Sequence, residues 1–239
     1  MIQFYRSDSH ITPMVNFRNL PVATVSLIAL NLLVFAFGFF TDSHTWIIRN
    51  FGFVPDSVFV RNELDNSHHS STLLTNPISP ENGTASTLVR LLSSMFIHAS
   101  ITHIVFNLAA LGYIGGYSER SIGTGRYVVI YFLSGICAAL FHGVIASYVL
   151  GNGQTLLIGA SGAISGVLGI AAATGNRRAY YWLLIQIVFV FVGSVTSIPI
   201  AFTAHIGGFL AGVILTKLMV KGELLQRRET NRLDEGGAY

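Results

Sequence analysis

Charged residues and cysteine are both scarce in this 239-residue sequence, and each shortage excludes a class of protein. Only 10% of the residues are Asp, Glu, Lys or Arg, whereas about a quarter is typical of a soluble domain. Because 51% are hydrophobic and the mean hydropathy is +0.59, an ordinary water-soluble protein is excluded. The single cysteine, Cys137, excludes an internal disulfide and a cysteine-built metal site, and we expect it to be buried. The composition therefore indicates a protein that lies in a lipid bilayer.

Apolar residues gather instead in six runs, at 22–40, 101–117, 126–149, 161–175, 180–197 and 201–220. A transmembrane helix needs about 20 predominantly apolar residues. The first run is too long for the apolar part of a signal peptide, and no small-residue cleavage site follows it, so we interpret it as a retained anchor helix. The pattern predicts an all-α membrane protein with six transmembrane helices.

Lys and Arg side chains mark the cytoplasmic side of this arrangement. Eleven of the fourteen occur in the N-terminal tail, between the second and third runs, between the fourth and fifth runs, and at the C-terminal end: Arg6, Arg18, Arg120, Arg126, Arg177, Arg178, Lys217, Lys221, Arg227, Arg228 and Arg232. The other three, Arg49, Arg61 and Arg90, all lie in the long first external loop. The loops at 150–160 and 198–203 carry no charge. This bias predicts that both termini are cytoplasmic. The net charge of +3 reflects that orientation, and we expect no nucleic-acid partner.

The chain divides into one membrane domain and two short tails. The tails cover 1–21 and 221–239, and the six-span domain covers 22–220. We expect this domain to lie in the bacterial inner (plasma) membrane. Only the first external loop, at about 41–100, has an appreciable length outside the bilayer.

The external loop has two parts of different composition. Residues 61–88 are rich in Ser, Thr and Asn, and we expect them to be poorly ordered. The run 89–97 is amphipathic and is predicted to lie in the membrane interface. His68 and His69 lack a third ligand at a suitable spacing, so we expect no metal site there.

Polar side chains inside membrane spans are functional candidates, because burying them among lipid is unfavourable. Here they are His103, Asn107, His142, Ser161 and His205. The second, fourth and sixth runs all enter from the outer side, so every one of these residues except His142 is predicted at a similar depth, in the outer third. His142 lies on a run of the opposite direction, and we assign it to structure.

These residues have a packing explanation as well as a chemical one. Taken alone, the Gly-x-Ser-Gly string around Ser161 is more typical of a helix packing face than of a catalytic site. A nucleophile, a base and two donors at one depth favour catalysis, since the imidazole of His205 can activate Ser161. His103 and Asn107 share one helical face, and they can donate toward the same point as the free backbone N–H of Ser161.

The same residues form three linked motifs that resemble those of rhomboid intramembrane serine proteases, over about 90–220. The motifs are His98-x4-His103-x3-Asn107, Gly159-x-Ser161-Gly162 and Ala204-His205-x2-Gly208-x3-Gly212. The resemblance implies that Ser161 is the nucleophile and His205 the general base and acid. It also implies that His103, Asn107 and the Ser161 N–H form the oxyanion hole. It further implies structural support from Arg90, His98, Gly159, Gly162, Gly208 and Gly212.

Two positions depart from the family pattern. Val89 stands where the family's Trp-Arg motif has Trp, and Ser165 stands where some bacterial members have a Tyr that stacks on the catalytic histidine. No carboxylate lies within any predicted span to orient His205. The residues therefore predict a Ser–His dyad without a third, acidic member.

The resemblance implies a serine endopeptidase that cleaves transmembrane protein substrates near the outer membrane face through an acyl-enzyme. It implies no cofactor and no metal. The alternative is a catalytically inactive relative that binds or escorts membrane helices. A small transporter is disfavoured, because the polar groups lie at the outer ends of spans and the sequence has no internal repeat. Nothing in the sequence indicates the oligomeric state.

Overall fold

Helices make up the regular structure of the computed structural model, which describes residues 20–59, 85–196 and 201–220. The predicted apolar runs coincide with the long helices: α1 (Val22–Phe40), α5 (Ile101–Ile122), α6 (Thr124–Ile145), α7 (Ser161–Ala173), α8 (Arg178–Thr196) and α9 (Phe202–Met219). A π-helical turn, η4 (Ala146–Leu150), extends α6. Within the described residues, α1, α6 with η4, and α9 are each long and apolar enough to cross a membrane. The all-helical membrane fold is confirmed, and a crossing by all six helices stays a prediction.

The described parts of the external loop are helical too. α2 (His44–Phe51) and α3 (Asp56–Phe59) follow α1, while α4 (Thr87–Ser93) and the 3-10 turn η3 (Ser94–Phe96) precede α5. The run predicted at the membrane interface falls on α4 and η3, which make an angle of 81° with α5 and add a fourth candidate span only when joined to it. Most of 61–88 and of the two tails lies outside the described residues, so the predictions for those segments stay predictions.

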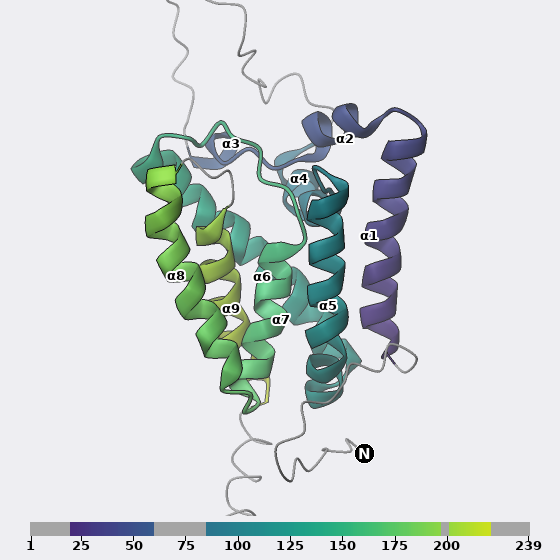
Figure 1. The fold of residues 1–239 in the computed structure, drawn as a ribbon, viewed down its shortest axis with the longest axis vertical. Helices are drawn as coiled ribbons and strands as arrows, with labels where there is room; N and C mark the ends of the chain where they lie inside the picture. Colours follow the sequence, from purple (N-terminus) through teal and green to yellow (C-terminus); the bar gives the residue numbers. More distant parts are fainter. Residues whose placement is uncertain (1–19, 60–84, 197–200, 221–239) are drawn as a thin grey trace, which may run out of the picture.

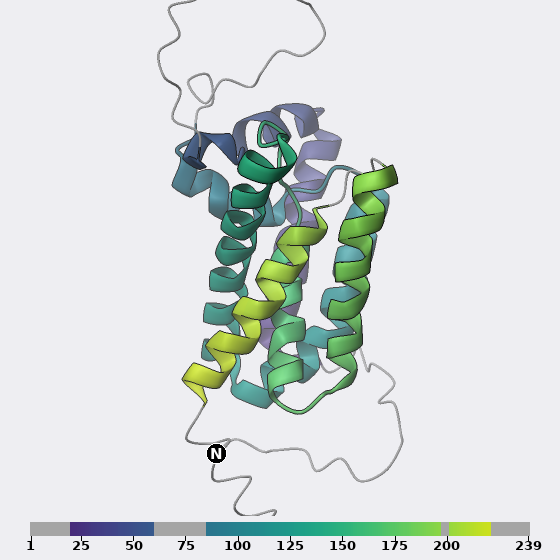
Figure 2. The same ribbon diagram turned by 90° about the vertical axis from the view of Figure 1, so that its left-hand side faces the viewer.

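The long helices run up and down in alternation along one axis (Figure 1). α1 begins and α9 ends at the lower end of this view, and α2, α3 and α4 lie across the upper end. Figure 2 shows α8 and α9 side by side on the face opposite α1. The chain between α6 and α7 descends into the bundle before α7 begins, so α7 starts well below the upper end (Figure 1).

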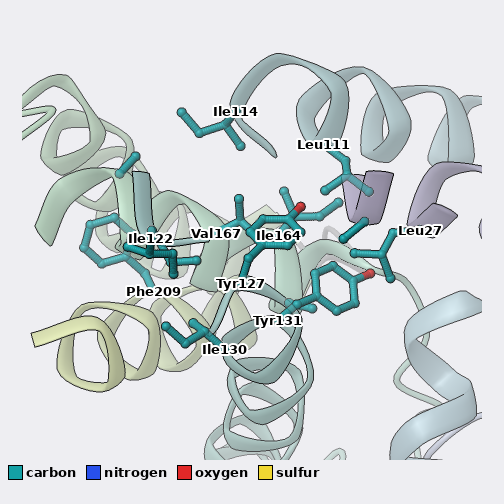
Figure 3. Packing of buried hydrophobic residues seen from close by; sticks show 14 of the residues in the cluster. Leu27, Leu111, Ile114, Ile122, Tyr127, Ile130, Tyr131, Ile164, Val167 and Phe209 are labelled. Atoms are coloured by element: carbon teal, nitrogen blue, oxygen red, sulfur yellow. The ribbon is translucent and has the colours of Figure 1, made fainter. Parts of the chain in front are cut away.

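α7 lies at the centre of the bundle because nearly every face of it is apolar or small. Its buried residues include Ala163, Ile164, Val167, Ile170 and Ala171. Around it, α1, α5, α6 and α9 contribute the side chains that meet in Figure 3, among them Leu27, Leu111, Tyr127, Tyr131 and Phe209. α7 packs most extensively against α9 and next against α6. Both helices that carry the predicted dyad are thus anchored in one core.

At the lower end a carboxylate ties α1 to α5. Glu119, buried in the last turn of α5, accepts hydrogen bonds from the backbone N–H groups of Ala23 and Thr24, at 3.1 and 2.8 Å. The hydroxyls of Thr24 and Thr124 each donate to it at 2.8 Å. Its negative charge lies at the N-terminus of α1, where the helix dipole favours an anion. The first helix is therefore held to the bundle by a charge-assisted cap.

One expectation about packing is wrong: Cys137 is exposed on α6. The buried face of α6 carries smaller residues at the neighbouring positions, Ser134, Gly135 and Ala138. A Cβ placed on Gly162 of α7 would lie 2.7 Å from the Ala138 Cβ, so α7 approaches too closely for anything larger. The thiol faces outward because the inward positions have no room for sulfur.

Candidate active site

Glycines form the contact between α7 and α9, and they let the first turn of α7 lie beside the first turn of α9. A Cβ on Gly208 of α9 would overlap the carbonyl oxygen of Gly162, and a Cβ on Gly212 would overlap that of Gly166. Small residues let membrane helices pack backbone to backbone in this way. We call these four glycines the α7–α9 seam. Gly162 follows Ser161 directly, and Ala204, whose carbonyl oxygen lies 4.0 Å from the Gly162 Cβ position, precedes His205.

Ser161 is the first residue of α7 and is half-buried. No side chain caps this helix, so its first backbone N–H groups have no partner within it. Ser165, one turn later, donates its hydroxyl to the Ser161 carbonyl at 2.6 Å. The hydroxyl that replaces the family's stacking Tyr therefore binds its own helix.

The Nε2–Cε1 edge of the His103 imidazole lies against Gly159, two residues before Ser161. Its Nδ1 accepts a hydrogen bond from the backbone N–H of Ala99 at 3.3 Å, so in the neutral ring the proton is on Nε2. The Nε2 and Ser161 Oγ atoms lie 2.7 and 3.9 Å from the point that a Cβ on Gly159 would occupy. Gly159 has a φ of +116°, which is a second reason why only glycine fits there. The donor edge of His103 and the serine hydroxyl therefore both lie around Gly159.

Asn107 is buried one turn beyond His103 on α5. Its Nδ2 donates to the carbonyl oxygen of His103 at 2.8 Å, a bond within the same helix. The amide has a second N–H, which leaves one donor for a bound molecule. Among the described residues no hydrogen bond joins Asn107 to Ser161.

His205 lies in the first turn of α9, and its ring is enclosed by α8. Its Nδ1 is 2.7 Å from the Oε1 of Gln186, a buried amide. The Trp182 ring lies 5.8 Å from the imidazole at a tilt of 43°, and the Phe202 ring meets it edge-on at 6.1 Å. No hydrogen bond between Ser161 and His205 is formed in the described structure. Catalytic hydrogen bonds are often long without substrate and tighten when it binds.

Arg90 and His98 connect the external helices to the bundle. Arg90, buried on α4, donates to the carbonyl oxygens of Arg49 and Gly52 at 3.2 and 3.1 Å. The carbonyl oxygen of His98 accepts a hydrogen bond from Nε2 of His44 on α2 at 2.8 Å. Burial lowers the pKa of the His98 imidazole to about 4, so the ring is uncharged at neutral pH. These contacts favour the supporting roles that the resemblance implies.

His142 joins α6 to α9 near the start of α9, where His205 lies. Its Nδ1 lies 2.6 Å from the hydroxyl of Thr203, two residues before His205. This contact favours a structural role for His142, which stays a prediction. Among the described residues, no group of three or more His, Cys, Asp or Glu side chains is placed to hold a metal ion.

Gln186 is the residue of this site that the sequence analysis missed. A signal was available, because it is a lone amide in the apolar run 180–197, one turn after Trp182. The predicted polar residues lie in the second, third, fourth and sixth runs, and this amide in the fifth run was not among them. A buried amide needs a hydrogen-bond partner, so the sequence predicts that Gln186 makes a hydrogen bond but does not show to which residue.

Comparison with known proteins points to one family. A model of the Rhomboid domain matches residues 85–222. Rhomboid protease GluP of Bacillus subtilis is 35% identical over 130 residues, which cover 52% of this chain and 24% of that protein. Rhomboid protease AarA of Providencia stuartii is 32% identical over 152 residues, which cover 52% of this chain and 53% of that protein.

An inactive relative is similar to a comparable degree. Inactive RHOMBOID-like protein 8 of Arabidopsis thaliana is 32% identical over 130 residues, which cover 51% of this chain and 35% of that protein. The chain therefore spans at most about half the length of these relatives. The domain match extends from α4 to the end of α9 and takes in the serine, the histidines and the glycine seam. Since it covers more than half of the sequence, the chain belongs to the rhomboid family.

Proposed function

We propose that the chain is an intramembrane serine endopeptidase with Ser161 as nucleophile and His205 as general base and acid. The observation that best supports this is the α7–α9 seam, which holds the start of the serine helix against the histidine-bearing end of α9. As Oγ of Ser161 attacks the substrate carbonyl carbon, its proton passes to Nε2 of His205. His205 then gives that proton to the leaving amine, and water hydrolyses the acyl-enzyme. No cofactor or metal takes part in these steps.

Negative charge on the attacked carbonyl oxygen needs donors that are already in place. The support for this role is strongest for His103, because its Nε2–H and the Ser161 hydroxyl lie around the same point at Gly159 while Nδ1 accepts from Ala99. The unpartnered N–H groups at the start of α7 add backbone donors and the positive end of the helix dipole. Asn107 completes the proposed oxyanion hole through its second N–H.

The proposed substrates are transmembrane segments of other proteins, cut near the outer membrane face. Both termini are then cytoplasmic, and the bacterial inner membrane is the proposed location. Two observations support this orientation: α1 begins and α9 ends at the lower end of the bundle, and the connection from α7 to α8, which carries Arg177 and Arg178, lies at that same end (Figure 1).

The alternative is an inactive membrane-helix binding or escort protein, and the name of the Arabidopsis relative is the observation that favours it. Against it, Ser161, His205 and His103 are all present, and Gly159 leaves room for the His103 ring beside the serine. A protein that only binds helices has no need for such a donor.

The experiment is activity-based labelling of the membrane-embedded protein with a serine-directed fluorophosphonate, together with cleavage of a transmembrane reporter. Ser161→Ala and His205→Ala should each abolish labelling and cleavage. The double variant should be no worse than either one, because residues that act as a unit are strongly non-additive. His142→Ala is the matched loss of a polar intramembrane histidine, and it should keep most of the activity. Cleavage by folded Ser161→Ala would contradict the proposal.

A further inference from the structure

The imidazole of His205 needs a partner that fixes its tautomer, and the described residues offer no carboxylate for this. A histidine that serves as base through Nε2 must carry its neutral-state proton on Nδ1. In serine proteases with a triad, an aspartate accepts that Nδ1–H and holds the ring in position. Here the position next to Nδ1 is occupied by the Oε1 of Gln186, 2.7 Å away.

An amide oxygen can only accept, so this contact requires that Nδ1 carries the hydrogen. Nε2 is then left with its lone pair free to take a proton. The opposite arrangement, with the amide nitrogen donating to Nδ1, would put the proton on Nε2 and leave no base. His205 can therefore act as a base through Nε2 only in the rotamer of Gln186 that places the amide oxygen next to Nδ1.

The surroundings favour a defined geometry over a chance contact. Gln186 is buried, so its amide cannot exchange this partner for bulk water without cost. Trp182 lies one helical turn earlier on the same face of α8, and its ring packs against the imidazole. The Trp182 ring is in turn stacked on Phe209 at 6.1 Å and 25°. One face of α8 thus supplies both the hydrogen bond and the ring contact.

Ser165 does not contribute to holding the ring. Its hydroxyl is committed to the Ser161 carbonyl at 2.6 Å and belongs to α7. The ring contact and the hydrogen-bond acceptor of His205 both come from α8.

We propose that Gln186 is a positioning residue for His205: its side-chain carbonyl accepts the Nδ1–H, fixes the tautomer with Nε2 unprotonated, and stabilises the imidazolium formed during proton transfer. This rests on the proposed assignment of His205 as the base. When Nε2 takes the Ser161 proton, the ring becomes positively charged and Nδ1–H remains a donor. The bond to the amide oxygen then becomes charge-assisted and strengthens. Gln186 gains and loses no proton in the cycle.

The first test compares near-isosteric variants. Gln186→Met keeps the length and volume of the side chain but removes the acceptor, and it should lower kcat by about ten- to a hundredfold, as for the loss of a hydrogen bond to a charged group. KM should be little changed, because Gln186 does not contact substrate. Gln186→Glu restores an acceptor and should recover kcat relative to Met. Asn31→Leu, which removes another buried amide outside the site, is the control and should keep kcat.

The second readout does not depend on turnover. Nitrogen-15 solid-state NMR of histidine-labelled protein in lipid bilayers should show His205 protonated on Nδ1, its signal being assigned by its loss in His205→Ala. Gln186→Met should shift this signal toward the other tautomer. A His205 protonated on Nε2 in the unaltered protein would overturn the proposal, even if Gln186→Met fails to fold.

The two proposals fail in different ways. If Ser161→Ala retains cleavage, the assignment of the dyad fails. If Ser161→Ala is inactive but Gln186→Met has the kcat of the unaltered protein, or Gln186→Glu is no better than Met, only the role of Gln186 is refuted.

Discussion

Adding one methyl group to the α7–α9 seam tests whether the geometry of the candidate site depends on the close packing of these two helices. The change is Gly208→Ala. In the structure the new Cβ would overlap the Gly162 carbonyl oxygen, lie 3.0 Å from the Gly162 carbonyl carbon and 3.3 Å from the Ala138 Cβ. The first two atoms belong to backbone, so no side-chain rotation relieves the overlap.

The helices must separate to admit the methyl group. Carbon atoms in contact lie about 3.5–4.0 Å apart, so a shift of roughly 1 Å is needed. Overpacking of this kind costs about 1–3 kcal/mol. We expect the upper part of that range, because the obstacle is a backbone carbonyl group and not a side chain that can rotate away. A misplacement of about 1 Å can also cost on the order of 10²-fold in rate, since Gly162 and Gly208 flank the dyad.

Gly125→Ala is the matched control. Gly125 lies in the first turn of α6, and a Cβ there meets nothing within 4 Å. The substitution should be neutral or stabilising by up to about 1 kcal/mol. Thermal unfolding in detergent measures the first effect, and kcat on a transmembrane reporter measures the second. If Gly208→Ala matched Gly125→Ala in both measurements, close backbone packing would not be what holds the two helices in place.

The remaining predictions concern the oxyanion hole, the first helix and the orientation. Asn107→Ala should lower turnover by about 10²–10³-fold yet leave slow fluorophosphonate labelling, whereas complete loss of labelling in a folded variant would give Asn107 a different role. Glu119→Gln, which keeps one acceptor oxygen of two, should destabilise the protein by about 1–3 kcal/mol in thermal unfolding with little change in KM, and an unchanged melting temperature would refute the cap on α1. A reporter active only outside the cytoplasm should be active when fused after Asn152 and inactive after Arg178, and the inverse result would place Ser161 on the inner side.

The long helices could be predicted because lipid imposes a simple rule on sequence. A membrane span must be apolar and must satisfy its own backbone, so runs such as 22–40 and 201–220 translate directly into α1 and α9. The common depth predicted for Ser161, His205, His103 and Asn107 followed from charge placement and helix rise alone. The approach of His103 to Gly159 and of Ala204 to Gly162 agrees with that prediction. Helix ends were less certain: Glu119 falls beyond the predicted run but inside α5.

The side-chain contacts between helices could not be predicted from the pattern of apolar and polar residues. The Nδ1 partner of His205 comes from α8 and depends on the rotation of that helix about its axis, which a uniformly apolar run does not reveal. The helices α2 and α3 were missed for a related reason. They are short, and α2 is anchored by the bond from His44 to the His98 carbonyl, 54 residues away. Cys137 was predicted on the wrong face because the space beside α7 is set by its glycines.

The central position of α7 also bears on how the protein is made. With 13 residues it is about 20 Å long, well short of the roughly 30 Å hydrocarbon core, and it is surrounded by protein rather than lipid. Its most extensive partner is α9, the last of the long helices to leave the ribosome. A nascent chain that stops before α9 has α7 without its main neighbour and lacks His205. On the proposed assignments, a copy that stops before α9 is therefore chemically inert.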